Sequence, residues 1–417
     1  MPSTNKQRPA PRSTRRASSL VAVIGIICFS VAFTLHRGAA VWIKQTSKSN
    51  DIFQLVPLID GHIDFPIWIR AFYQNHIYQD NFTSDGPLSG QVDFPRLMEG
   101  KLGAAFWSAY VECSDDTNNN SDEVYREIIH DTLQQVDLVH RLIKEYPESL
   151  QHAYTAADVE RIFEKYKTSR ISSMIGIEGL HQIGNSASIL RMYYALGVRY
   201  ATLTHTCHNK YADSEEPAEP LHGGLSEAGK SIVAEMNRLG MIVDLSHTSF
   251  NTQRDVLKIS AAPVIFSHSN AYGLYNHTRN VPDDVLEALR ENQGVIMATF
   301  YPQFLGNDTS KASLFQVADH IEYIGGMIGY RYVGIGSDFD GMANGPSGLE
   351  DVSKYPQLVM ELQRRGLRDA DIRGVMGLNI LRVFKNVEGL ARSMRHVRPL
   401  EDDVKPFFSL MAITKGE

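Results

Sequence analysis

The chain alternates short, continuous apolar runs with longer stretches in which apolar residues recur at helical spacing. Runs without intervening polar residues are typical of strands that are buried on both faces of a parallel sheet. The pattern predicts eight such strands, at Leu55–Ile59, Gly103–Val111, Ser173–Ile177, Tyr200–Thr204, Met241–Leu245, Pro263–Phe266, Val295–Phe300 and Tyr332–Gly336. Helices are predicted between them at Val124–Lys144, at Ser226–Leu239 and, after a first-turn proline, at Pro282–Glu291.

Strands that alternate with helices over about 300 residues predict a (β/α)8 TIM barrel, an α/β fold. A doubly wound open sheet is the competing topology, but no glycine-rich phosphate loop follows the first predicted strand. Residues 350–394 are typical of a closing helical region, and the sequence contains no internal repeat. We therefore expect one catalytic domain over residues 52–417, with residues 37–51 as a linker in front of it.

Composition and charge exclude several classes of protein. With 43% hydrophobic and 21% charged residues among 417, the chain is not mainly disordered, and three cysteines cannot staple a fold of this length. The net charge is -7, although residues 1–18 carry five cations and no acid, so the remainder is more acidic still. A nucleic-acid partner is therefore not expected.

The amino-terminal segment predicts a route to or through a membrane. The basic arm at residues 1–18 precedes an uncharged apolar stretch within residues 19–36, which is at the short end of a membrane span. Cations before the span favour a cytoplasmic amino terminus and a single-pass, type II anchor with the catalytic domain outside the cytoplasm. A cleaved signal peptide is the alternative, because Ala32 with Thr34, or Gly38 with Ala40, supplies a small-x-small exit; the protein would then be secreted.

Two further features agree with a secretory route. Sequons for N-glycosylation occur at Asn81, Asn119, Asn276 and Asn307. Cys28 lies within the apolar span, which leaves Cys113 and Cys207 as a possible pair in an oxidising compartment.

Six of the eight predicted strands end in a histidine, aspartate or glutamate. Each residue alone has an ordinary structural explanation, such as a satisfied core histidine or an acid in the first turn of a helix. Their convergence is harder to explain in that way, because the carboxyl ends of barrel strands meet at one end, where active sites lie. The residues are His62 and Asp64, Glu178, His205, Asp244 and His247, His268, and Asp338 and Asp340.

Imidazole and carboxylate together suit zinc or a similar divalent metal. The number of ligand-type groups exceeds the three protein ligands of a single catalytic zinc, so two metals fit better, and Glu178 is the acid placed to bridge them. Such a pair suits hydrolysis of an amide or a phosphoester by a bridging hydroxide. The sequence contains neither a Gly-x-Ser-x-Gly elbow nor a His-Glu-x-x-His helix.

At these residues the chain resembles the membrane dipeptidase family, the renal-dipeptidase type of zinc metallopeptidase, and its fungal members in particular. The similarity extends in the family's order over residues 55–390. The matching stretches are residues 60–66, 176–179, 200–205, 243–247, 267–269, 279–284 and 336–341.

The resemblance implies a (β/α)8 barrel of the metallo-dependent hydrolase type with two zinc ions per chain. By position, His62 and Asp64 would hold one zinc, His247 and His268 the other, and Glu178 would bridge them. Members of the family are commonly homodimers.

The resemblance also implies the roles of the remaining residues. His205 would stabilise the oxyanion, Arg279 would bind the carboxylate of the dipeptide, and Asp338 would carry the proton from the attacking water to the leaving amine. Tyr301 matches a position in the substrate pocket. The pair Cys113 and Cys207 matches one disulfide of the family.

The leading hypothesis is therefore a membrane-anchored, zinc-dependent dipeptidase that cleaves a broad range of free dipeptides. Ile63, Phe65 and Leu180 depart from the animal members, which leaves open cysteinyl-glycine conjugates or cyclic amides as substrates of the same chemistry. An inactive membrane-anchored receptor or scaffold is a hypothesis of another class; it is disfavoured because no metal ligand is lost and Asp338 is present. Related amidohydrolase barrels start with His-x-His and often bridge their metals with a carboxylated lysine, unlike this chain.

Overall fold

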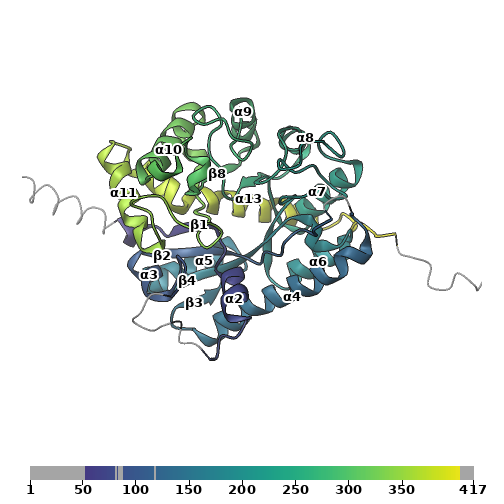
Figure 1. The fold of residues 1–417 in the computed structure, drawn as a ribbon, viewed down its shortest axis with the longest axis horizontal. Helices are drawn as coiled ribbons and strands as arrows, with labels where there is room; N and C mark the ends of the chain where they lie inside the picture. Colours follow the sequence, from purple (N-terminus) through teal and green to yellow (C-terminus); the bar gives the residue numbers. More distant parts are fainter. Residues whose placement is uncertain (1–51, 80–81, 83–87, 117–118, 404–417) are drawn as a thin grey trace, which may run out of the picture. The chain divides into compact units, whose positions relative to one another are not determined.

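Eight parallel strands close into a barrel in the computed structural model, which describes residues 52–79, 82, 88–116 and 119–403 (Figure 1). The strands pair in the circular order β1, β2, β4, β5, β6, β7, β8, β9 and back to β1. The expected (β/α)8 architecture is confirmed. The strand bounds are β1 Leu58–Ile63, β2 Leu102–Ser108, β4 Ile171–Glu178, β5 Val198–Thr202, β6 Ile242–Asp244, β7 Ile265–Phe266, β8 Val295–Ala298 and β9 Val333–Ile335.

A ninth strand, β3 at Leu150–His152, lies outside this ring. It pairs with the first half of β4, where Leu150 stands opposite Ile171, whereas the second half of β4 pairs with β5. The sequence pattern does not predict β3, because three residues are too few to establish a periodicity.

All eight predicted strands overlap observed ones, but the first is displaced toward the carboxyl terminus. Residues 52–55 are helical, and β1 begins only at Leu58. The side chain of Leu55 is 62% exposed. Leu55 is therefore not part of the buried strand to which the sequence pattern assigned it. As a result, His62 lies inside β1 and Asp64 follows directly after it.

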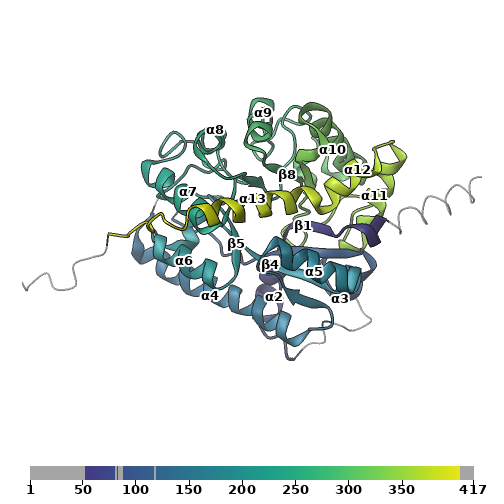
Figure 2. The ribbon, with the colours of Figure 1, turned by 180° about the vertical axis from the view of Figure 1, so that it is seen from behind.

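Helices surround the barrel on the outside (Figures 1 and 2). The predicted helices are present, although the one expected from Val124 begins at Asp122, where the Ser121 side chain caps it by accepting from the Val124 amide. The start expected at Ser226 is confirmed, since the Ser226 side chain accepts from the Gly229 amide. Gly240 ends its helix with φ of 86°, a left-handed conformation that glycine adopts without strain. The helices are α2 Phe65–Tyr73, α3 Phe94–Glu99, α4 Asp122–Glu145, α5 Ala156–Tyr166, α6 Ala187–Ala195, α7 Glu227–Leu239, α8 Phe250–Ile259, α9 Asp283–Asn292, α10 Leu314–Ile328, α11 Tyr355–Arg364, α12 Asp369–Arg373 and α13 Asn379–Ser393.

Helix α13 closes the end of the barrel where the strands begin. Figure 2 shows it running across the molecule in front of the strands. Its buried Ile380, Phe384 and Val387 pack in one cluster with residues near the strand starts, such as Ile59 and Val295. This end is therefore filled with apolar side chains, and polar chemistry is confined to the opposite end, where the strands finish.

The disulfide between Cys113 and Cys207 is present, with the two Cα atoms 6.2 Å apart. It ties the segment after β2 to the segment after β5 at the carboxyl ends of the strands.

Several predictions concern residues outside the described ranges. The arm 1–18, the apolar stretch 19–36, the linker 37–51 and the sequon at Asn81 all lie there. Asn119, Asn276 and Asn307 are described, and all three are exposed. Across the described part of the chain, no helix combines the length and the apolar character needed to span a membrane.

Candidate active site

A cavity of about 520 Å³ opens at the end of the barrel where the strands finish. Most of the residues that the sequence predicts for the site line this cavity: Glu178 is the last residue of β4, and the others come from the segments after six further strands. His62 and His268 are fully buried behind them. The predicted residues in the lining are Asp64, Glu178, His205, His247, Arg279, Tyr301 and Asp338.

Glu178, the last residue of β4, lies between two groups of ligand-type side chains. Its Oε2 is 3.4 Å from Nε2 of His62. Its Oε1 is 3.1 Å from Nε2 of His247 and 3.3 Å from Nε2 of His268. The two oxygens of one carboxylate therefore contact different imidazoles, Oε2 that of His62 and Oε1 those of His247 and His268.

Two groups of potential metal ligands share this carboxylate. His62, Asp64 and Glu178 form one, and Glu178, His247 and His268 form the other, with the ligand atoms of each group within 4.8 Å of one another. In the first group, Nε2 of His62 is 3.2 Å from Oδ2 of Asp64. Both Nε2 of His62 and Oδ1 of Asp64 are buried without a hydrogen-bond partner. Buried polar atoms of this kind indicate that a ligand completes the site.

A third set of ligand-type atoms, from Cys113, His181 and Cys207, has a different explanation. The two sulfur atoms are joined in the disulfide, so they are not free to bind a metal. The Nε2 atom of His181 lies 2.8 Å from the Val111 carbonyl oxygen, which makes this histidine a structural residue.

The imidazoles of His62 and His268 have hydrogen-bond partners at the ring nitrogen away from Glu178, whereas Nδ1 of His247 has none. Nδ1 of His62 is 2.8 Å from the Tyr200 hydroxyl, and Nδ1 of His268 is 2.8 Å from the Ser267 hydroxyl. Ser267 in turn donates to Oδ2 of Asp244 at 2.6 Å. Such partners orient metal-binding histidines and fix which ring nitrogen points inward.

Sequence reasoning did not assign these supporting roles. Asp60 and Asp244 stand next to the predicted ligands in the sequence, and both are fully buried. Asp60 accepts from the amides of His62 and Ser337, at 2.9 Å each, and so ties the end of β1 to the end of β9. A buried aspartate beside a ligand was the available signal for Asp60 and Asp244, whereas no sequence signal connects Tyr200 with His62.

The surroundings of the site lower the pKa of one carboxyl group, that of Glu178, and raise the pKa of another, that of Asp338. Burial opposes ionisation of Glu178, but the imidazoles of His62 and His205 outweigh it and hold the pKa of this carboxyl well below its ordinary value. Burial and the nearby carboxylate of Asp64 raise the pKa of Asp338 well above its ordinary value. One carboxyl is thus suited to remain an anion, and the other to exchange a proton.

Backbone conformation at the site is unusual. His247, Asp338 and Asp340 all have left-handed backbones, with φ of 62°, 71° and 67°. Non-glycine residues in this region are uncommon and cluster at functional sites. The Asp338 amide donates to the His62 carbonyl oxygen at 3.0 Å, so neighbouring strands hold this turn in place.

His205 stands in the cavity wall between two other rings. Its ring centre is 4.7 Å from that of Tyr110 and 4.3 Å from that of His247. Burial lowers the pKa of His205, and its Nδ1 has no hydrogen-bond partner. Tyr110, which the sequence reasoning missed, lies just after β2 and lines the same cavity.

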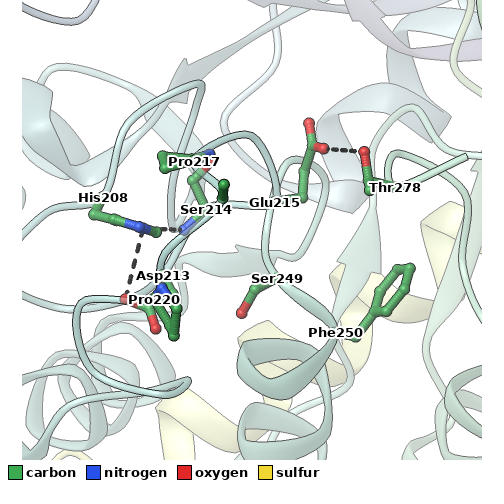
Figure 3. Close-up of a pocket in the computed structure, with 10 residues that line it drawn as sticks. His208, Asp213, Ser214, Glu215, Pro217, Pro220, Ser249, Phe250 and Thr278 are labelled. Carbon is green, nitrogen blue, oxygen red and sulfur yellow. Dashed lines mark hydrogen bonds and ion pairs between the residues drawn. The ribbon is translucent and has the colours of Figure 1, made fainter.

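Arg279 also lines the cavity and lies over Phe304, with its guanidinium carbon 5.2 Å from the ring centre. Tyr301 stacks on the same ring at 4.5 Å. The wall between this cavity and a smaller one of about 180 Å³ contains Glu215. Figure 3 shows the smaller cavity, with the Glu215 carboxylate turned toward the Thr278 hydroxyl.

Comparison with known proteins agrees with this geometry. Residues 46–398 match the family described as membrane dipeptidase, peptidase family M19. The dipeptidase aclJ of Aspergillus oryzae is 56% identical over 410 residues, which cover 96% of each chain.

Solved structures share the fold. The probable dipeptidase PvdM of Pseudomonas aeruginosa superposes with a TM-score of 0.75 at 23% identity, covering 84% of this chain and 99% of its own. A metallopeptidase of Rhodobacter sphaeroides, liganded with a phosphinate mimic of the dipeptide L-Ala-D-Ala, gives 0.70 at 24% identity, covering 80% and 99%. The chain therefore belongs to the membrane dipeptidase family, peptidase family M19, and is a hydrolase that acts on peptide bonds.

Proposed function

We propose that this enzyme is a zinc-dependent dipeptidase that cleaves a broad range of free dipeptides with two zinc ions per chain. The observation that carries the proposal is the position of Glu178, whose two oxygens face His62 on one side and His247 with His268 on the other. A carboxylate in this position is suited to bridge two metal ions.

The donor atoms present fit zinc. His62, Asp64 and Glu178 would hold one ion, and Glu178, His247 and His268 the other. Imidazole nitrogen and carboxylate oxygen are zinc ligands, and the unpartnered buried atoms of His62 and Asp64 are satisfied if a cation binds there. When bound, the two ions would polarise the scissile carbonyl and lower the pKa of water to supply the nucleophile.

The residues of the chain account for the remaining needs of peptide hydrolysis. His205, in the wall beside His247, would stabilise the negative charge that develops on the carbonyl oxygen. Asp338, whose pKa is raised, would accept a proton from water and return it to the leaving amine. Both side chains line the same cavity, within reach of one substrate.

Arg279 and Tyr301 would bind the carboxyl-terminal residue of the dipeptide. Both line the cavity, and its volume of about 520 Å³ is suited to a small molecule. The dipeptide mimic in the Rhodobacter sphaeroides relative supports a dipeptide-sized substrate. The inactive-receptor hypothesis is disfavoured, because every residue needed for metal binding and proton transfer is present.

We also propose that the catalytic domain acts outside the cytoplasm, anchored by the apolar stretch at 19–36 or secreted after its cleavage. The disulfide and the exposed sequons at Asn119, Asn276 and Asn307 support an oxidising, glycosylating compartment. Membrane fractionation of the full-length protein, with protease protection of the catalytic domain as the readout, tests the anchor and its orientation. Homodimer formation stays a prediction from the family.

The decisive experiment measures zinc content and dipeptide hydrolysis on the same preparation of full-length protein, before and after chelation. About two zinc per chain, with hydrolysis that chelation abolishes and added zinc restores, supports the proposal. A folded, zinc-loaded protein that cleaves no member of a diverse dipeptide panel would overturn it.

A further inference from the structure

The guanidinium of Arg279 is held in place by its own neighbours. Nη1 donates to the Ser269 hydroxyl at 3.4 Å, and Nη2 donates to the His268 carbonyl oxygen at 3.2 Å. The guanidinium also lies over the Phe304 ring. Its Nε is buried without a hydrogen-bond partner, on the side of the guanidinium that faces Glu215.

Glu215 faces this arginine from the opposite loop. Its Oε1 is 3.7 Å from Nε of Arg279, and both side chains are only 4% exposed. This distance is too long for a hydrogen bond but short enough for an ion pair. Glu215 therefore acts on Arg279 through its charge and does not hold the guanidinium in position. Among the described residues, Glu215 is the acid that forms an ion pair with Arg279.

The position of Glu215 is itself fixed. Its amide donates to the His247 carbonyl oxygen at 3.1 Å, and Thr278 donates its hydroxyl to Oε2 at 2.5 Å (Figure 3). The first bond fixes the backbone of Glu215, and the second holds its carboxylate beside Arg279. Both Glu215 and Arg279 line the cavity, so a substrate that contacts one lies close to the other.

The pairing of Glu215 with Arg279 changes which terminal group of a substrate binds well beside them. A lone arginine attracts a free carboxylate, but a carboxylate beside a buried arginine offsets part of its positive charge. A substrate carboxylate placed there therefore gains less from Arg279 than it would from a lone arginine, because the Glu215 carboxylate opposes it. A carboxamide matches the pair, because its oxygen accepts from a guanidinium and its amino group donates to a carboxylate.

We propose that Glu215 determines specificity at the carboxyl end of the substrate, so that the enzyme also cleaves dipeptides whose carboxyl terminus is an uncharged amide. The inference deepens the proposed dipeptidase function and rests on it. The reaction on such a substrate is the same hydrolysis of the internal peptide bond, and it releases an amino-acid amide instead of a free amino acid.

The test compares Ala-Gly with Ala-Gly amide on zinc-loaded, full-length wild type and on Glu215→Gln. Wild type should cleave both substrates with kcat/KM values within about tenfold of each other. Glu215→Gln keeps the shape of the side chain and removes its charge. It should lower KM for Ala-Gly and raise KM for Ala-Gly amide, while kcat for Ala-Gly changes little. The ratio of the two kcat/KM values should therefore shift at least about tenfold in favour of Ala-Gly.

Glu219→Gln is the matched control, because it removes the same charge from an exposed position on the same loop that does not line the cavity. It should leave the ratio unchanged. Wild type that cleaves Ala-Gly but not the amide overturns the inference and leaves the proposed function standing, as does an unchanged ratio in Glu215→Gln. If wild type cleaves neither substrate nor any other dipeptide, the proposed function fails, and the inference fails with it.

Discussion

The hydroxyl of Tyr200 lies 2.8 Å from Nδ1 of His62, and both residues are fully buried inside the barrel. The ring of Tyr200 occupies the space beside Gly176, where a Cβ atom would stand 2.2 Å from Cζ of the tyrosine. The first glycine of the Gly176-Ile177-Glu178-Gly179 stretch is therefore explained by packing. It makes room for the tyrosine that orients His62 toward Glu178.

Replacing Tyr200 with phenylalanine should weaken metal binding at the His62 group. The substitution keeps the ring and removes only the hydroxyl that holds Nδ1, so His62 loses its fixed orientation. Loss of such a partner lowers metal affinity by roughly 10–100-fold. Competition with a chromophoric chelator measures the affinity. Tyr125→Phe is the control, because it removes a buried hydroxyl that donates to Asn120 instead; equal weakening in both variants would refute the role of Tyr200.

Gly176→Ala should destabilise the protein. The added methyl group overlaps the Tyr200 ring, and overpacking of this kind in a core costs about 1–3 kcal/mol of folding free energy. A lower midpoint of thermal unfolding is the expected result. The same change at Gly326, an exposed position in α10 with no atom within 4 Å of a built Cβ, should be neutral or slightly stabilising. A midpoint for Gly176→Ala no lower than that of Gly326→Ala would contradict the packing argument.

Asp338→Asn should keep both metals and lose most of the activity. The side chain would still fill its place, but it could not exchange the proton, and such groups contribute about 10²–10⁴-fold to the rate. Glu178→Gln should instead reduce metal occupancy, because it weakens the ligand that we propose to bridge the metals. Parallel measurement of kcat and metal content separates the two roles. Asp338 also lies within 4.8 Å of ligand atoms of His62 and His268, so metal loss in Asp338→Asn would identify it as a ligand.

Acid should destabilise the protein partly through His320. Burial lowers the pKa of this histidine from 6.5 to about 4, and its Nδ1 accepts from the Ala271 amide at 3.2 Å, which requires the neutral ring. The unfolded chain binds a proton near pH 6.5, whereas the folded protein resists it until about pH 4. Stability from this group is complete above pH 6.5 and is lost as the pH falls toward 4, by up to about 3 kcal/mol.

Unfolding midpoints in urea at pH 7 and pH 5 test this dependence. The decline between the two pH values should be smaller in His320→Gln than in wild type, because glutamine also accepts the Ala271 amide but does not titrate. An identical decline in the two proteins would assign the acid sensitivity to other groups.

Much of the site could be predicted from the sequence, because the fold makes strand ends converge. Once the apolar runs predict a parallel barrel, His62, Glu178 and His268 must approach one another, although they are far apart along the chain. Their residue types then indicate a divalent metal. Errors remained where the local signal was weak: Leu55 was assigned to a strand, and the three-residue strand β3 was not found.

The sequence by itself determined the barrel, the end at which its chemistry lies, and the residue types available there, because hydrophobic periodicity and strand-end position are local properties. Only the tertiary structure decided that Glu178 faces two groups, that Tyr200 contacts His62, and that Glu215 lies beside Arg279. These relations depend on which atoms of distant residues meet. Side-chain direction and packing across the barrel determine these contacts, and no local pattern along the chain predicts them.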